Sequence, residues 1–127
     1  MNHTLSKNER LHSKKSIKEL FDKGSSFFLY PFKVLSLNRS QDSIETNQVL
    51  FSVSKKKIRK AVDRNKIKRR IKEAYRLNKH LLSNTNSKKN LALIYVSSDI
   101  SSFKKIEPSI QKILVRLDQL SNETKKI

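Results

Sequence analysis

The hydrophobic and polar positions along the chain alternate in patterns that predict three helices and three strands. Apolar residues recur at helical spacing in three segments and follow strand-like patterns in the three others. In chain order the segments are residues 11–23, 27–37, 48–54, 59–82, 91–96 and 103–120. The continuous apolar run of the fifth segment is typical of a central strand that is covered on both faces. The order of the segments indicates an α+β fold, a sandwich with helices packed on a small sheet.

Individual residues refine the boundaries of these segments. Ser13 or Ser16 can cap the first helix, and Gly24, the only glycine in the chain, lies where a helix C-terminus often requires one. Pro31 interrupts the first strand, so this strand either lies at a sheet edge or breaks into two pieces. Pro108 belongs in the first turn of the last helix or kinks that helix.

The length of the chain is that of one domain, which we expect to span residues 1–127. We expect residues 1–10 to form a loosely ordered basic arm and residues 121–127 to form a frayed tail. The chain has no cysteine, no apolar run long enough to cross a membrane and no apolar core of a signal peptide at its N-terminus. These features predict a cytoplasmic protein with no membrane partner.

Basic residues dominate the charge of the chain. There are 29 Lys and Arg against 11 Asp and Glu, which gives a formal net charge of +18. Residues 55–79 alone contain 13 Lys or Arg against Asp63 and Glu73, a net charge of +11. Such a concentration of cations predicts a surface that binds a polyanion, and nucleic acid is the commonest one. A membrane surface is the weaker interpretation, because the apolar side of the long helix has no Trp or Phe to insert into lipid.

The long helix has an apolar side and a basic side. Ile67, Ile71 and Ala74 lie on the apolar side, which can pack on a sheet. Cations recur on the other side about one turn apart, roughly 5–6 Å, which is close to the spacing of successive phosphates. They are Arg64, Lys68, Lys72, Arg76 and Lys79, flanked by Asn65 and Arg69. The alternative is a solvated helix surface, but such a surface normally carries many Glu–Lys pairs, which this helix lacks.

The sequence contains no motif for catalysis by side chains, so we assign no catalytic and no metal-binding residue. The histidines are scattered, the carboxylates form no cluster along the chain, and one glycine cannot make a phosphate-binding glycine-rich loop. The aromatic residues allow a second kind of binding surface. Phe27, Phe28 and Tyr30 cannot all point inward from one strand, so at least one should be exposed and able to stack on an unpaired base.

Three short stretches around the long helix form a recognisable motif. They are Ser54-Lys55-Lys56, Ala61-Val62-Asp63-Arg64-Asn65 and Lys68-Arg69. A strand that ends in an S-K-K-type turn, followed by A-V-x-R-N and x-x-K-R on a basic helix, resembles the protein subunit of bacterial ribonuclease P. The resemblance extends over most of the chain, because the first helix, the strand at 91–96 and the last helix also fall where that family places them.

The resemblance implies a fold and a function. The fold is an αβββαβα order with an uncommon left-handed crossover around the basic helix, whereas sequence rules alone predict the right-handed form. The function is that of a non-catalytic subunit, one protein per RNA, which binds a large catalytic RNA and the 5′ leader of precursor tRNA. The RNA removes the leader with Mg²⁺, which the RNA-containing enzyme requires and the protein alone does not bind.

The resemblance also implies roles for individual residues. The residues implied to contact RNA are Ser54, Lys55, Lys56, Arg64, Asn65, Lys66, Lys68, Arg69, Lys72 and Arg76. The groove implied for the leader lies between the first helix and the sheet and contains Ile17, Phe21 and Leu35. Only Phe21 keeps an aromatic residue of the family there. The link at 57–60 lacks the usual glycine of the family and is one residue longer.

Two alternatives remain open from the sequence. A ribosomal or other structural RNA-binding protein with no role in cleavage fits the composition equally well. A metal-dependent nuclease that acts alone needs a carboxylate cluster, which would have to form in space from residues far apart in the chain. The motif and the order of the strands favour the ribonuclease P subunit over both.

Overall fold

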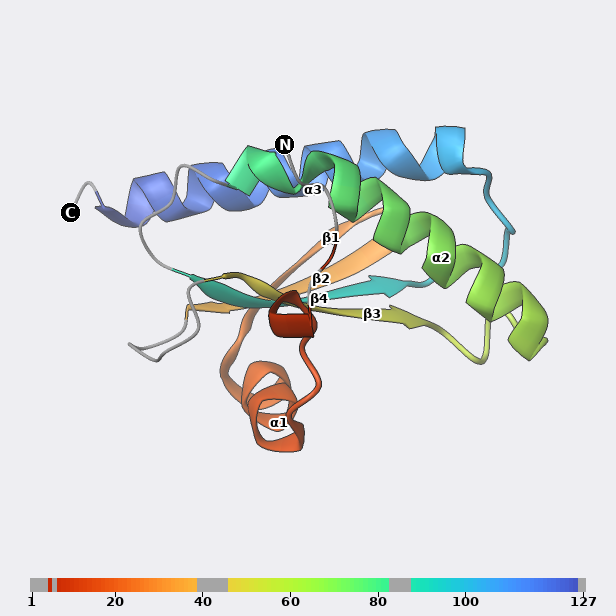
Figure 1. Cartoon of the computed structure of the whole chain (residues 1–127), viewed down its shortest axis with the longest axis horizontal. Helices are drawn as coiled ribbons and strands as arrows, with labels where there is room; N and C mark the ends of the chain where they lie inside the picture. Colours follow the sequence, from red (N-terminus) through yellow and green to blue (C-terminus); the bar gives the residue numbers. More distant parts are fainter. Residues whose placement is uncertain (1–4, 6, 39–45, 83–87, 126–127) are drawn as a thin grey trace.

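The helices and strands follow one another in the order that the family resemblance implies (Figure 1). The computed structural model of the chain describes residues 5, 7–38, 46–82 and 88–125. Its elements are η1 (Lys7–Glu9), α1 (Lys14–Lys23), β1 (Ser25–Leu29), β2 (Phe32–Asn38), β3 (Gln48–Val53), α2 (Ala61–Asn78), η2 (Lys79–Leu82), β4 (Lys89–Tyr95) and α3 (Phe103–Lys125). The six predicted segments and the α+β class are therefore confirmed.

The four strands form one sheet in the order β1-β2-β4-β3. β2 is antiparallel to both β1 and β4, whereas β3 and β4 are parallel. A turn with a cis peptide bond between Tyr30 and Pro31 joins β1 to β2, so the proline breaks the expected strand into two pieces. β4 lies between two neighbouring strands and is buried along almost its whole length, which confirms the prediction of a central strand.

The connection from β3 through α2 to β4 is left-handed. In Figure 1 both strands point to the right, β3 is nearer to the reader than β4, and α2 lies above the sheet. About 98% of connections between parallel strands are right-handed. The general rule therefore predicts the wrong hand for this chain, and the family resemblance implies the correct one.

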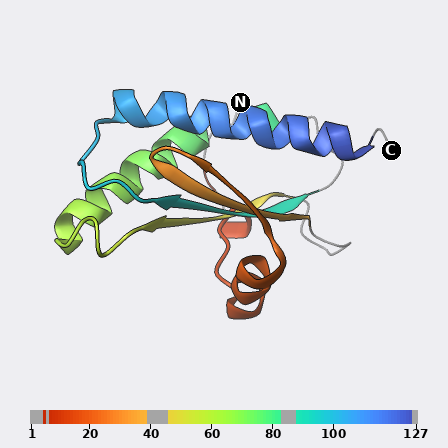
Figure 2. The same ribbon diagram turned by 180° about the vertical axis from the view of Figure 1, so that it is seen from behind.

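Helices cover the two faces of the sheet unequally (Figures 1 and 2). α2 and α3 lie side by side on one face, and the shorter α1 lies against β2 and β4 on the other. The larger core fills the space between the sheet and the pair α2 and α3. The smaller core lies beneath α1 and consists of Leu11, Leu20, Leu35 and Ala92. Because α1 is short, it leaves part of its face of the sheet uncovered.

The apolar side of α2 fixes this helix on the sheet. Ile67, Ile71 and Ala74 are fully buried, as their spacing predicts. Tyr75 is also buried and packs edge-on against Phe51 of β3, with ring centroids 5.6 Å apart. Burial, with a smaller contribution from the nearby Glu9 carboxylate, raises the pKa of Tyr75, so its phenol stays neutral. The opposite side of α2 is thereby held toward solvent.

α1 begins at a serine that caps it and ends at Gly24, which packs closely against the backbone. The Ser13 side chain accepts a hydrogen bond from the Ser16 N–H at 3.3 Å, so Ser13 is the capping residue. Gly24 follows the last residue of α1, as expected, with extended backbone angles, φ −69° and ψ 152°. These angles do not require a glycine. Lack of space explains why the residue is a glycine. A Cβ atom at residue 24 would meet the carbonyl oxygen of Leu20 and lie 3.2 Å from that of Ser36.

We expect Gly24→Ala to destabilise the protein, because the added methyl group forces α1 away from β2. Overpacking of this kind costs about 1–3 kcal/mol. Denaturant unfolding followed by circular dichroism measures the free energy of unfolding. Ser26→Ala, at an exposed position of β1, is the control and should unfold like the parent protein. An unchanged free energy of unfolding for Gly24→Ala would contradict the close contact.

The N-terminal arm is packed on the domain over part of its length. Lys79 Nζ donates a hydrogen bond to Glu9 Oε1 at 2.7 Å, and both side chains are mostly buried. The Leu11 N–H donates to the carbonyl of Val49 at 3.0 Å. Residues 7–10 of the expected arm are therefore packed on the domain, and most of the residues before them, where we expect the loose order, lie outside the described part of the chain.

α3 is longer than the sequence predicts. It continues to Lys125, so most of the expected tail at 121–127 is helical, and residues 126–127 lie outside the described residues. Pro108 is the sixth residue of the helix, one turn later than the expected first turn. A proline early in a helix removes one hydrogen-bond donor there, and α3 continues through it.

Candidate nucleic-acid interface

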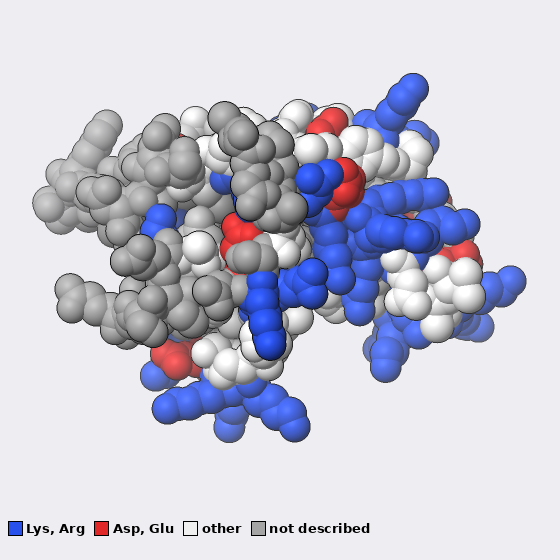
Figure 3. All heavy atoms as spheres, in the orientation of Figure 1, with Lys and Arg blue, Asp and Glu red and all other residues white. Residues whose placement is uncertain are grey.

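α2 presents a basic surface to solvent (Figure 3). Lys and Arg side chains gather over this helix and around the turn that precedes it. We call the following residues the α2 surface: the exposed Asn65, Arg69 and Lys72, and the partly exposed Lys66 and Lys68. Among the described residues, no acidic side chain pairs with Arg69 or Lys72. Cations on successive turns of one helix can contact successive phosphates of an RNA strand.

The predicted site residue Arg76 lies at the end of this row and is paired within the helix. Its Nε donates a hydrogen bond to Glu73 Oε2 at 3.2 Å, and its Nη2 contacts Glu73 Oε1. The hydrogen bond with Glu73 raises the pKa of Arg76, so Arg76 stays charged, but the carboxylate compensates that charge. The α2 surface is therefore strongest over its middle turns, and Arg76 adds less to it than its spacing predicts.

Arg64 does not lie in the outward row that the sequence predicts. Its Nη1 donates hydrogen bonds to the carbonyl oxygens of Ile58 at 2.9 Å and of Arg59 at 2.7 Å. Lys60, the residue before α2, makes no side-chain cap. Arg64 thus folds back on the turn before α2 and fixes it, so its first role is to position the turn. The contact of Arg64 with RNA stays a prediction.

We expect Arg64→Ala and Lys68→Ala to behave differently. Arg64→Ala should lower the free energy of unfolding by about 1–2 kcal/mol, because it removes charge-assisted hydrogen bonds to two carbonyls. Arg64→Lys should not restore it, since an ammonium group lacks the forked geometry. Lys68→Ala should weaken RNA binding and leave stability unchanged. Thermal unfolding together with an RNA-binding titration separates the two effects, and equal melting temperatures for both alanine variants would contradict the role of Arg64.

The turn before α2 presents three adjacent lysines, Lys55, Lys56 and Lys57, all exposed. The Ser54 hydroxyl accepts a hydrogen bond from the Lys57 N–H at 3.4 Å, and the Ile58 N–H donates to the Ser54 carbonyl at 3.0 Å. Ile58 is buried and anchors the turn in the core. No described residue has a positive φ, so this longer turn needs no glycine. The lysines face solvent, whereas the predicted site residue Ser54 serves the turn itself.

The face of the sheet beneath α1 has an uncovered part, which we call the open sheet face. The strand register aligns one residue from each of the four strands in a row across it. In sheet order the row is Phe28, Lys33, Ile94 and Ser52. Phe28 is 58% exposed, Lys33 is exposed, and the other two are half-buried. A flat surface with an aromatic ring and a cation suits an unpaired nucleic-acid strand.

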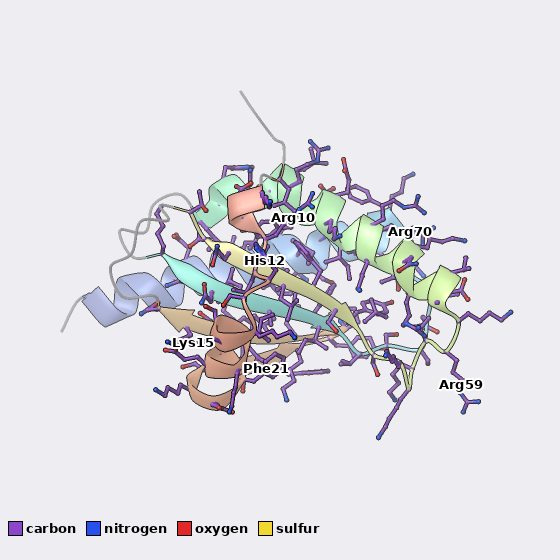
Figure 4. All side chains as sticks on the ribbon, turned by 60° about the horizontal axis from the view of Figure 1, so that its bottom comes forward. Arg10, His12, Lys15, Phe21, Arg59 and Arg70 are labelled. Atoms are coloured by element: carbon purple, nitrogen blue, oxygen red, sulfur yellow. The ribbon has the colours of Figure 1, made fainter. Side chains whose placement is uncertain are left out.

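The three residues predicted for the leader groove differ in their exposure. Phe21 is 51% exposed, Ile17 is half-buried, and Leu35 is only 6% exposed in the small core beneath α1. Figure 4 shows Phe21 on the side of α1 that faces the turn with Arg59, and Lys15 on the other side. Phe21 therefore borders the open sheet face. Leu35 is buried and supports α1 from below, so it offers little surface for the predicted contact with a leader.

Two exposed residues of the open sheet face, Phe28 and Lys33, are missing from the predicted site. The sequence predicts that at least one aromatic residue of the first strand is exposed, and both Phe28 and Tyr30 are. Phe27 points to the other face, where the Arg116 guanidinium lies 4.4 Å from its ring centroid. Alternation along β1 distinguishes two faces, but only the strand register and the contacts of α1 with β2 and β4 show which face is partly uncovered.

The described part of the chain contains no group of three or more His, Cys, Asp or Glu side chains that could hold a metal ion. Within those same residues, no helix has the length and the apolar character needed to cross a membrane. The interface built by α2, the lysine turn and the open sheet face consists of cations, amides, hydroxyls and exposed aromatic rings. These groups can contact the phosphates and bases of RNA.

Solved structures of other proteins share the fold of this chain. The RNase P protein of Staphylococcus aureus matches with a TM-score of 0.70 and 24% identity, over 89% of this chain and 97% of that one. The RNase P protein of Thermotoga maritima matches with a TM-score of 0.69 and 24% identity, over 85% of this chain and 96% of that one. At this identity the structures show the shared fold.

Sequence relatives extend the likeness from fold to family. The Ribonuclease P family model matches residues 5–118. The Ribonuclease P protein component of Porphyromonas gingivalis is 38% identical over 117 residues, which cover 89% of this chain and 85% of that protein. That of Clostridium novyi is 31% identical over 115 residues, which cover 88% and 96%. These matches do not favour a ribosomal protein. The chain belongs to the ribonuclease P protein family, as an RNA-binding component of the ribonucleoprotein endonuclease that processes the 5′ ends of tRNA.

Proposed function

We propose that this ribonuclease P protein binds two RNA segments with two surfaces. The α2 surface and the lysine turn bind the catalytic RNA. The open sheet face, bordered by Phe21, binds the single-stranded 5′ leader of precursor tRNA. One protein binds one catalytic RNA, and that RNA cleaves the precursor with Mg²⁺, while the side chains of the protein bind and orient the two RNAs.

The charge of the α2 surface supports the first assignment. Arg69 and Lys72 are exposed on the same side of a helix whose other side is buried. A folded RNA brings its phosphates close together, and fixed cations reduce their repulsion as bound Mg²⁺ does. The protein should therefore lower the Mg²⁺ concentration at which the RNA folds and cleaves.

Exposed aromatic rings carry the second assignment. Phe21 and Phe28 are more than half exposed, at 51% and 58%, although burial of an aromatic side chain stabilises a small protein. They lie on two different elements that border the same face of the sheet, beside the exposed Lys33. Rings that stack on bases and a cation that contacts the backbone bind single strands of any sequence. A leader, whose sequence differs between precursors, is such a strand.

We expect Phe21→Ala and Phe28→Ala each to weaken binding of precursor tRNA by about ten-fold, because stacking of one base on an aromatic ring contributes about 1–3 kcal/mol. The binding of mature tRNA, which has no leader, should not change. The measurement is the dissociation constant of the protein–RNA enzyme for both substrates under conditions that prevent cleavage.

Val115→Ala is the control for this experiment. Val115 is an apolar residue, 42% exposed, on α3 at the opposite face of the sheet. Its replacement should change the dissociation constant of neither precursor nor mature tRNA. Equal weakening of precursor and mature tRNA by the phenylalanine variants would show that the open sheet face binds something other than the leader.

A further inference from the structure

A pocket lies beside the turn between β1 and β2, at the end of the sheet where α3 begins. Its volume is about 720 Å³, and its lining includes Tyr30, Asp99, Ile100, Ser101, Lys105 and Ser109. Figure 2 shows the β1–β2 turn and the first turns of α3 at the same end of the molecule. None of these residues belongs to the α2 surface or to the open sheet face.

Hydrogen bonds hold the walls of the pocket in place. The Tyr30 hydroxyl donates to Ser97 Oγ at 3.1 Å, which fixes the ring of an otherwise exposed side chain. The hydroxyl of the buried Tyr95 donates to the carbonyl of Asp99 at 2.6 Å and lies 2.8 Å from Ser101 Oγ. Because both walls are fixed, a ligand that enters the pocket need not order them first.

The pocket is also tied to the basic helix. Arg70 of α2, labelled in Figure 4, donates a hydrogen bond from its Nη1 to the carbonyl of Ser101 at 2.7 Å. On its other side, the pocket adjoins the open sheet face, since the rings of Tyr30 and Phe28 lie 6.2 Å apart, centroid to centroid. A strand of RNA that crosses the open sheet face at Phe28 therefore meets Tyr30 next.

The lining of the pocket fits a nucleotide better than a free anion. Tyr30 is 63% exposed and Ile100 is 47% exposed, and together they offer apolar surface for a flat base. Lys105 offers a cation for a phosphate. The Asp99 carboxylate repels an isolated phosphate, but it can accept hydrogen bonds from the amino or imino groups of a base edge. Serine hydroxyls of the lining can donate or accept.

We propose that this pocket binds one unpaired nucleotide of the single-stranded RNA that lies on the open sheet face. The base stacks on Tyr30, the edge of the base faces Asp99, and Lys105 contacts the phosphate. The proposal rests on the proposed binding of the leader by the open sheet face and extends it around the β1–β2 turn. Neither α2 nor α1 supplies a side chain to this pocket lining.

The test uses the whole protein and an unstructured oligoribonucleotide of about ten nucleotides, within the range that one such surface spans. Fluorescence anisotropy gives the dissociation constant. Tyr30→Ala should weaken binding by about ten-fold. Tyr30→Phe keeps the ring but loses the hydrogen bond to Ser97, so it should weaken binding less than Tyr30→Ala does. Lys105→Gln should weaken binding, and Lys112→Gln should not. Lys112 is the matched control, because it is exposed on the same side of α3, two turns further on, outside the pocket.

A crosslink gives a readout that does not depend on a stable variant. Oligoribonucleotides that carry 4-thiouridine, irradiated with the parent protein, should crosslink at Tyr30 or at residues 97–109. Crosslinks confined to α1 and the open sheet face would overturn the proposal that the pocket binds a nucleotide. Equal effects of Lys105→Gln and Lys112→Gln would do the same. Inorganic phosphate that displaces the oligoribonucleotide from Tyr30 at low concentration would show a simple anion site and also overturn the proposal.

The outcome separates this inference from the proposed function. If the parent protein does not bind the oligoribonucleotide, both the proposed binding of the leader by the open sheet face and the proposed binding of a nucleotide by the pocket are wrong. If the parent protein binds and Phe28→Ala weakens binding, but the Tyr30 and Lys105 variants bind like the parent, only the pocket is wrong.

Discussion

Replacement of both Arg69 and Lys72 by alanine is expected to weaken binding of the catalytic RNA by about 100-fold. Both side chains are exposed on α2 and have no acidic partner among the described residues. Each can make a charge-assisted hydrogen bond to phosphate, with a contribution of about 1.5 kcal/mol or more. Because two phosphate contacts disappear, the slope of log affinity against log salt concentration should fall by about 1.5. Titrations of the catalytic RNA at several salt concentrations measure both quantities.

A second double variant controls for the loss of net charge. Lys104 and Lys112 are exposed on α3, so Lys104→Ala with Lys112→Ala removes the same charge from another helix. Affinity and salt slope should stay close to those of the parent protein. The melting temperature should not change in either variant, since none of the four side chains is buried. Equal losses of affinity in the two variants would mean that the RNA responds to net charge and not to the α2 surface.

Ile71→Ala should have the largest effect on stability. Ile71 is fully buried on the apolar side of α2, in the core shared with the sheet and α3. A substitution of this kind removes buried apolar surface and leaves a cavity, which costs about 3 kcal/mol. For a domain of this size that lowers the melting temperature by about 10 °C. Differential scanning calorimetry measures the change.

Val62→Ala is the matched control for Ile71→Ala. Val62 is an aliphatic residue of the same helix, but it is 73% exposed, so its truncation should leave the melting temperature within error of the parent value. At a temperature where Ile71→Ala is still folded, its RNA affinity should equal that of the parent protein. A loss of affinity without a loss of stability would show that the packed side of α2 has a role beyond support.

The Arg69/Lys72 double variant and Ile71→Ala test two roles of α2 residues. The exposed residues are proposed to bind RNA, and the buried residues hold the helix on the sheet. The sequence predicts this division well in the middle of the helix, because a period of 3.6 residues separates the buried Ile67 and Ile71 from the exposed Arg69 and Lys72. It predicts the division poorly at the helix ends. There a long cation can reach neighbouring polar groups, as Arg76 reaches Glu73.

By itself the sequence determined the class of the fold, the order of the helices and strands, the central strand β4 and the family. These features follow from local periodicity and from short motifs, which are written in adjacent residues. It also determined that the protein binds a polyanion, because a net charge of +18 does not depend on the arrangement of the chain.

The tertiary structure alone decided which of the predicted residues face solvent. Arg64 turns back to the carbonyls of residues 58 and 59, and Leu35 lies beneath α1. Phe28 and Lys33 become neighbours on an open surface only through the pairing of β1 with β2. The left hand of the β3–α2–β4 connection does not follow from the general rule, and only the family resemblance indicated it before the structure. The physical reason is that hydrogen bonds and packing in the folded chain set where a side chain points. The partners are near in the chain for Arg64 and far apart in the chain for Leu35 and Phe28, and hydrophobic periodicity records neither.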